Sequence, residues 1–178
     1  MKSKGLRGVE AGSTSICTVG ENGKGLLYRG YDVVDLSKDC IFEEICYLLL
    51  YGKLPNKFEL KEFIDEIISK RNLPDSLKNV LEKIPKLTNP MDVLRTGCSM
   101  LGNLETEKEF SEQSDKIDRI LAVMPSIINY WYKFSHEGVR IETSTNDDSI
   151  AGHTRKCGKN GNNGECNSGG QWGCIIRR

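Results

Sequence analysis

The residues best suited to chemistry lie near the C-terminus, in a segment rich in glycine and asparagine. One histidine and three cysteines occur there with the spacing His-x3-Cys-x8-Cys-x7-Cys, namely His153, Cys157, Cys166 and Cys174. One imidazole and three thiolates can hold a structural zinc ion in tetrahedral geometry. Structural zinc sites usually contain two cysteines separated by about two to four residues, and this segment has no such pair. Zinc binding is therefore one interpretation of this segment, and its spacing argues against it.

The composition of the chain changes abruptly at His153. Residues 154–178 carry five basic side chains and one acidic side chain, a net charge of +4, which leaves −4 for residues 1–153. The segment also lacks an apolar period, as a disordered basic arm does. An out-of-frame peptide would look the same. We expect a partial helical domain over residues 1–153 and a Gly/Asn/Cys-rich tail over residues 154–178 that is disordered or out of frame.

Two other features could carry chemistry, and both favour a structural interpretation. The chain has seven cysteines, an odd number that predicts no disulfide framework. Cys46 and Cys98 stand among apolar neighbours, where a cysteine usually behaves as a small buried hydrophobic residue. The sequence GENGKG at residues 20–25 lacks the spacing of a phosphate-binding loop and predicts a turn.

The overall composition predicts a soluble globular protein. The 178 residues are 38% hydrophobic with a formal net charge of zero, so nothing suggests nucleic acid or a membrane as a partner. The N-terminus has no signal-peptide pattern, and the longest apolar run, residues 45–51, is too short to span a bilayer. We therefore expect a cytoplasmic location.

The elements that must position any site are mainly helical. Two β-favouring runs around the glycine-rich turn predict a hairpin over residues 15–29. Helices are expected from residue 42 to the glycine at 52, from Asn56, after Asp75, from Asn89–Pro90, and from about Glu112 to Phe134. Pro125 should kink or break the last helix.

Each predicted helix has an apolar face that should point inward. The residues assigned to these faces are Phe42, Ile45, Cys46, Leu49 and Leu50; Leu60, Phe63, Ile64, Ile67 and Ile68; Leu77, Val80, Leu81 and Ile84; Met91, Leu94, Cys98 and Leu101; and Ile117, Ile120, Leu121, Met124, Ile127, Ile128 and Trp131.

Several collinear segments resemble one known family. They are STSICTVGENGKGLLYRGYDVVDL, FEEICYLLLYGKLP, NPMDVLRTGCSMLG, YWYKFSHEGVRIE and DDSIAGH. Over about residues 5–153 the chain is similar to the N-terminal portion of the citrate synthase family, and most of all to its 2-methylcitrate synthase branch. YRGYD at residues 28–32 and LLLYGKLP at residues 48–55 are the most specific pieces.

The resemblance implies a mainly α fold, with the N-terminal helices of a citrate-synthase-like large domain and a short β ribbon. Members of the family are homodimers that condense an acyl-CoA with oxaloacetate. Propanoyl-CoA gives 2-methylcitrate and acetyl-CoA gives citrate, each with release of CoA. An aspartate removes the α-proton, one histidine steadies the enolate and a second protonates the ketone, while arginines hold the oxaloacetate carboxylates.

None of these catalytic groups maps onto this sequence. The family's catalytic positions lie beyond His153, and both His136 and His153 match positions that are not catalytic. We expect a truncated chain with no catalytic or cofactor-binding residues, no bound cofactor and no activity alone. Unpartnered apolar stripes at residues 60–68 and 117–131 should make it self-associate or aggregate. The alternative is a non-catalytic helical interaction module with a zinc-binding tail.

Overall fold

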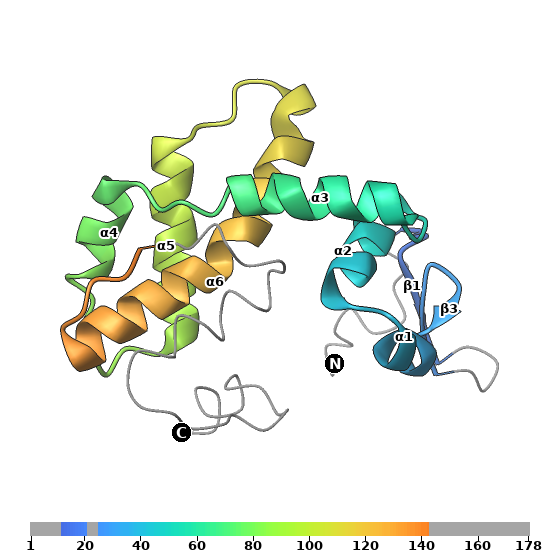
Figure 1. Cartoon of the computed structure of the whole chain (residues 1–178), viewed down its shortest axis with the longest axis horizontal. Coiled ribbons are helices and arrows are strands. Elements are labelled where there is room, and N and C mark those ends of the chain that lie inside the picture. Colours follow the sequence, from blue (N-terminus) through green and yellow to red (C-terminus); the bar gives the residue numbers. More distant parts are fainter. Residues whose placement is uncertain (1–11, 21–24, 143–178) are drawn as a thin grey trace, which may run out of the picture. The chain divides into compact units, whose positions relative to one another are not determined.

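The computed structural model describes residues 12–20 and 25–142, which fall into two compact units divided between Lys57 and Phe58 (Figure 1). Each unit is described by itself. The predicted mainly α fold is confirmed, because helices make up most of the described residues and the strands are short. The predicted boundary at residue 153 lies outside the described residues.

The first unit begins with a small antiparallel sheet. Its strands β1 (Cys17–Val19), β2 (Leu26–Tyr28) and β3 (Tyr31–Asp32) pair in chain order. The hairpin predicted over residues 15–29 is confirmed, and the glycine-rich stretch connects two antiparallel strands rather than opening a helix. Strand β3 was not predicted, because two residues are too few to form a recognisable pattern.

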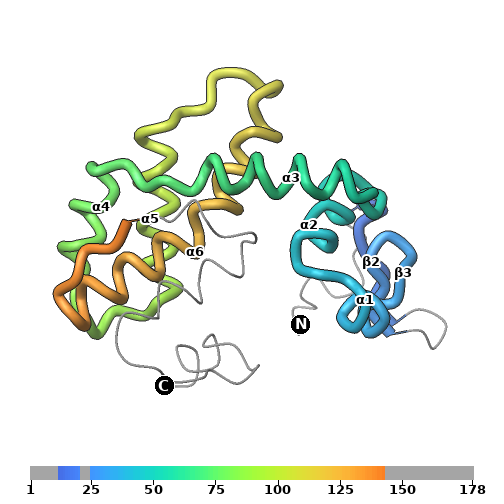
Figure 2. The backbone as a smooth tube through the Cα atoms, in the orientation of Figure 1, coloured from blue at the N-terminus to red at the C-terminus, as the bar shows by residue number. Residues whose placement is uncertain are grey.

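Two helices complete the first unit (Figure 2). The sequence analysis missed α1 (Val33–Asp39), which Asp32 caps by accepting a hydrogen bond from the Val34 amide at 2.7 Å. Helix α2 (Phe42–Tyr51) has the predicted bounds and ends at Gly52, whose φ of +83° suits a glycine.

The predicted buried face of α2 is wrong in part, because Ile45, Cys46 and Leu49 are half-buried. Phe42 and Leu50 are exposed, whereas Leu48 and the carboxylate residue Glu43 are buried. The predicted stripe selected apolar residues only. It therefore missed a face that includes a charged residue, which is uncommon in buried positions.

The second unit contains the remaining helices. They are α3 (Lys57–Ser69), α4 (Asp75–Leu81), α5 (Pro90–Leu104), the short 3₁₀ helix η2 (Phe110–Glu112) and α6 (Gln113–Glu137). Helices α4, α5 and α6 pack on one another and enclose a continuous apolar core. Its buried members are Leu73, Leu77, Leu81, Val93, Leu101, Val123, Ile127, Ile128, Tyr130 and Trp131.

Helices α5 and α6 approach closely where Gly97 faces Ile127. A Cβ atom placed on Gly97 would lie 2.8 Å from the Cγ2 atom of Ile127, which is shorter than atomic packing allows. The absence of a side chain at this position therefore sets the distance between the two helices.

The predicted helix starts agree with the structure. Helix α3 begins directly after Asn56, and α5 begins at Pro90. The Asn89 side chain accepts a hydrogen bond from the Met91 amide at 2.9 Å, as expected of an N-cap. Met91 itself is exposed, so its predicted inward position is wrong.

Pro125 was predicted to kink or break α6, and the break is wrong, because the helix continues through it. A proline removes one backbone N–H and crowds the preceding turn, which usually interrupts an isolated helix. Here Pro125 is buried, and residues on both sides of it pack into the core, so tertiary packing holds the helix together.

The apolar stripe of α6 is only half covered. Ile128 and Trp131 are buried, but Ile117, Ile120 and Met124 in the first half of the helix are 45%, 42% and 38% exposed. Their predicted inward positions are therefore wrong within this chain. No helix among the described residues is long and apolar enough to cross a membrane.

Candidate functional site

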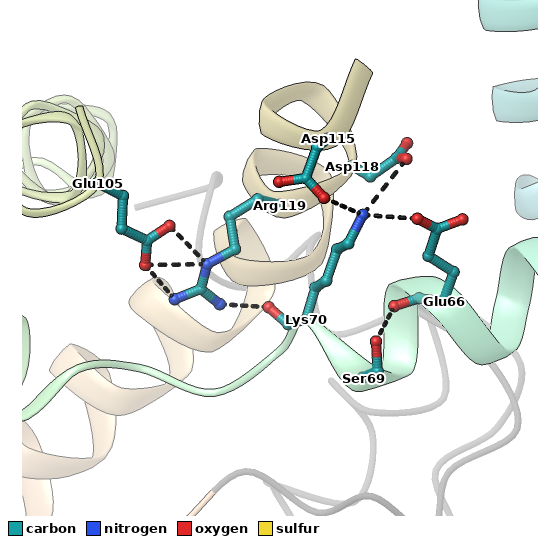
Figure 3. Close-up of polar contacts among 7 residues, drawn as sticks. All are labelled: Glu66, Ser69, Lys70, Glu105, Asp115, Asp118 and Arg119. Carbon is teal, nitrogen blue, oxygen red and sulfur yellow. Dashed lines mark hydrogen bonds and ion pairs between the residues drawn. The ribbon is translucent and has the colours of Figure 1, made fainter. Parts of the chain in front are cut away.

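Among the described residues of the second unit, a group of charges lies where the end of α3 meets the start of α6. We call it the Lys70 cluster. It comprises Glu66, Lys70, Asp115 and Asp118, together with the neighbouring pair Arg119–Glu105 (Figure 3). Lys70 directly follows α3, and α6 supplies the two aspartates and the arginine.

The Lys70 ammonium faces three carboxylates. Its Nζ atom lies 2.7 Å from Glu66 and 2.8 Å from Asp115, and 3.7 Å from Asp118. Burial lowers the pKa of Lys70, but the hydrogen bonds to Asp115 and Glu66 outweigh it, and the net pKa is raised. Lys70 is therefore protonated throughout the neutral range.

The two aspartates of this cluster differ in their titration. The hydrogen bond from Lys70 lowers the pKa of Asp115, whose side chain is 64% exposed. Burial raises the pKa of Asp118, whose side chain is only 5% exposed. The same ammonium therefore stabilises one charged aspartate and leaves the other poorly compensated.

Arg119 joins α6 to the turn that follows α3. Its guanidinium binds Glu105 at 2.7 to 3.2 Å, and it donates to the backbone carbonyls of Lys70 and Asn72, the latter at 2.8 Å. Carbonyls at a helix C-terminus lack partners within the helix, so a guanidinium is a suitable donor for them. This arrangement anchors the turn between α3 and α4.

A second polar group holds the residues that follow α6. Glu82, next to α4, accepts hydrogen bonds from the Tyr130 hydroxyl at 2.7 Å and from the Arg140 guanidinium at 2.8 Å. Those hydrogen bonds lower the pKa of Glu82. Burial, followed by the hydrogen bond to Glu82, raises the pKa of Tyr130 to about 12. This group fastens residue 140 to α4.

In the first unit, Arg29 links the sheet to α2. Arg29 and Gly30 form the two-residue turn between β2 and β3, with φ values of +50° and +91°. The Arg29 side chain donates to the Ser15 hydroxyl at 2.6 Å and to the Leu49 carbonyl at 3.0 Å. These contacts help to offset the strain of a left-handed arginine, which is of the order of 1–3 kcal/mol.

One groove lies between α4 and α5, and it offers no catalytic pair. Its volume is about 360 Å³, and its lining residues are Val80, Arg95, Thr96, Ser99, Met100 and Asn103. Arg95 pairs with Asp92 at 3.2 Å, and the Thr96 hydroxyl donates to a backbone carbonyl. The lining therefore contains no nucleophile beside a general base.

The structure places one of the two histidines. His136 lies in the last turn of α6, where its ring stacks on Tyr132 and its Nδ1 atom lies 2.8 Å from the Ser135 hydroxyl. The four residues considered for zinc, His153, Cys157, Cys166 and Cys174, lie outside the described residues. Among the residues that are described, no group of histidine, cysteine and carboxylate side chains could hold a metal ion.

The cysteine interpretation needs a small correction. Cys46 and Cys98 are half-buried rather than buried. Burial raises the pKa of both thiols, that of Cys46 to about 11, so neither is an activated thiolate at neutral pH.

Sequence reasoning missed the Lys70 cluster. The Glu66–Lys70 spacing of four residues on a predicted helix indicates an ion pair. Asp115, Asp118 and Arg119 were visible as charges near the start of a predicted helix. No local pattern indicated that these two segments come into contact, because they are more than forty positions apart in the sequence.

Comparisons with known proteins identify a family for this chain. A family model described as "Citrate synthase, C-terminal domain" matches residues 5–165, which is most of the chain. The chain belongs to the citrate synthase family. It is 58% identical to 2-methylcitrate synthase of Shewanella oneidensis over 84% of its own length and 40% of that protein. Citrate synthase of Mycolicibacterium smegmatis is 39% identical over 70% of the chain.

Solved structures of the citrate synthase family agree with this assignment. The enzyme of Thermotoga maritima matches 92% of this chain and 43% of its own with a TM-score of 0.78 and 31% identity. Citrate synthase of Thermoplasma acidophilum, solved as a ternary complex with carboxymethyl coenzyme A and oxaloacetate, matches 87% of this chain with a TM-score of 0.78 and 25% identity. The chain spans about two-fifths of the length of these relatives.

Proposed function

We propose that this chain is part of an acyl-CoA:oxaloacetate condensing enzyme. The favoured reaction joins propanoyl-CoA to oxaloacetate and gives 2-methylcitrate and CoA, and the related reaction with acetyl-CoA gives citrate. The observation that carries the proposal is the 58% identity to the 2-methylcitrate synthase of Shewanella oneidensis. At about 39% identity the relatives include both 2-methylcitrate synthases and a citrate synthase, so the acetyl-CoA reaction stays the second candidate. The Thermoplasma acidophilum relative supports the substrate class, because it was solved with a CoA derivative and oxaloacetate.

We further propose that the chain alone does not catalyse this reaction. A thioester α-proton is weakly acidic, so a base and an electrophile must be held on either side of it. The charged groups described above are engaged in ion pairs that join helices, and the groove between α4 and α5 lacks such a pair. The resemblance also places the family's catalytic groups beyond His153.

The test is a condensation assay on the purified chain with propanoyl-CoA and with acetyl-CoA. The chain's own seven cysteines would react with thiol reagents, so free CoA is measured by chromatography. We expect the same slow CoA release with and without oxaloacetate. The full-length Shewanella oneidensis 2-methylcitrate synthase serves as the positive control. Oxaloacetate-dependent CoA release by the chain would contradict the proposal of inactivity.

The proposed partner is a second copy of the chain. The half-covered stripe of α6, residues Ile117, Ile120 and Met124, supports self-association, because exposed apolar side chains in a row favour burial against another surface. No cofactor is proposed for the chain itself, and the acyl-CoA and oxaloacetate are substrates of the whole enzyme.

A further inference from the structure

The junction between α3 and α6 is held by charges that are unequally matched. Two cations, Lys70 and Arg119, face four carboxylates, and Arg119 is already engaged with Glu105 at both of its carboxylate oxygens. The Lys70 ammonium is shared among Glu66, Asp115 and Asp118 (Figure 3). One ammonium group therefore serves three carboxylates, and they are not served equally.

The distances show which carboxylate is left over. An ammonium group has three N–H bonds. Glu66 and Asp115 lie at hydrogen-bonding distance from the Lys70 Nζ atom, 2.7 and 2.8 Å, whereas Asp118 lies at 3.7 Å. A separation of 3.7 Å is too long for a strong hydrogen bond. Of the three carboxylates, Asp118 therefore has the weakest contact with Lys70.

Asp118 is also the carboxylate that water reaches least. Its side chain is almost fully buried, and removing a carboxylate from water is costly unless it is fully paired. The charges that act on it are those of Lys70, Glu66 and Asp115, and two of these three repel it. Lys116 acts on Asp115 in the same turn and helps to keep that group ionised.

We propose that the junction between α3 and α6 is a latch tightened by protons, in which Asp118 is the residue that takes up the proton. A neutral Asp118 removes the repulsion with Glu66 and Asp115 and leaves Lys70 to its two short contacts. The end of α3 is then held more firmly against α6. The latch does not depend on the condensation reaction.

The pH dependence follows from opposite shifts in the two aspartates. The pKa of Asp118 is raised on folding, so its contribution to stability is present at low pH and is lost as the pH rises through its folded pKa. The pKa of Asp115 is lowered, so its contribution is present above the unfolded pKa and is lost as the pH falls through the folded pKa. Between these two pKa values the latch is tightest.

The experiment compares Asp118→Asn with Asp115→Asn in the full chain. Urea unfolding is measured at about pH 7 and about pH 5. At the higher pH we expect Asp118→Asn to be at least as stable as the parent and Asp115→Asn to be less stable. The parent should approach Asp118→Asn as the pH falls. The proposal is overturned if Asp118→Asn is destabilised as much as Asp115→Asn.

A second measurement needs no substitution. The Asp118 carboxyl carbon is titrated by NMR in the parent chain, and amide exchange at residues 70–72 is followed as protection relative to unstructured peptide. We expect Asp118 to titrate above an ordinary aspartate, and amide protection to rise with the same midpoint as the pH falls. A midpoint at or below that of an ordinary aspartate, or protection that falls with pH, would overturn the latch.

Discussion

At the scale of single residues, the group around Glu82 shows how one hydroxyl can hold a chain segment. The Tyr130 side chain is buried, and its hydroxyl donates to the same carboxylate that binds Arg140. A hydrogen bond to a charged group contributes more than one between neutral groups. The contact thus connects the core of the second unit to the residues that leave α6.

We expect Tyr130→Phe to lower the melting temperature by a few degrees, because Glu82 loses one donor. The effect should depend on pH. The pKa of Tyr130 is raised to about 12, so its contribution is present at lower pH and is lost as the pH rises through about 12. Thermal unfolding of both proteins is measured from neutral to alkaline pH. The difference between their melting temperatures should shrink as the pH rises.

Tyr132→Phe is the matched control for that substitution. Tyr132 lies on the same helix, and its ring stacks on His136 while no hydrogen bond to its hydroxyl occurs among the described residues. We expect its melting temperature to equal that of the parent. An equal loss in both variants would mean that the hydroxyl of Tyr130 is not what stabilises the fold.

The sequence allowed some single residues to be predicted and not others. Asn89 and Pro90 lie next to each other and have a strong preference for a helix start, so α5 could be predicted from them alone. Arg119 donates hydrogen bonds to the carbonyls of Lys70 and Asn72, which are 49 and 47 positions away in the sequence. A contact of that kind depends on how two helices meet, and no local pattern encodes it.

At the scale of elements, the positions of the helices were easier to predict than their buried faces. The bounds of α2 agree with the prediction, yet Leu48 rather than Phe42 is buried. The spacing of apolar residues indicates that a helix has a buried face. Where two adjacent rows of residues are apolar, the packing of neighbouring elements determines which row is buried. The same reasoning explains α6, where packing in its second half also keeps the helix continuous at Pro125.

At the scale of the whole molecule, the chain covers about 40% of its 2-methylcitrate synthase relative. A family resemblance could be identified from short collinear segments, because these are specific even when most of the relative has no counterpart. The exposed half of the α6 stripe could not be predicted, because its exposure depends on what other chain segments are present to cover it.

We expect the chain to self-associate through this stripe. Ile120→Glu places a charge at its centre and should shift the chain towards the monomer, as measured by sedimentation velocity at several concentrations. Leu87→Glu is the matched control, because Leu87 is 95% exposed but lies outside α6. A monodisperse parent monomer with one cooperative unfolding transition would contradict the expectation, as would equal effects of the two substitutions.

The close approach of Gly97 to Ile127 makes the two positions a coupled pair during sequence change. Gly97→Ala alone should cost about 1–3 kcal/mol of unfolding free energy, because the new methyl group overlaps the isoleucine. Ile127→Val alone should cost about 0.5–1.5 kcal/mol, because it removes buried contacts. Together they should cost less than the sum, and a double-mutant cycle by urea unfolding measures that difference. Which substitution either position tolerates would then depend on the residue that the other already carries.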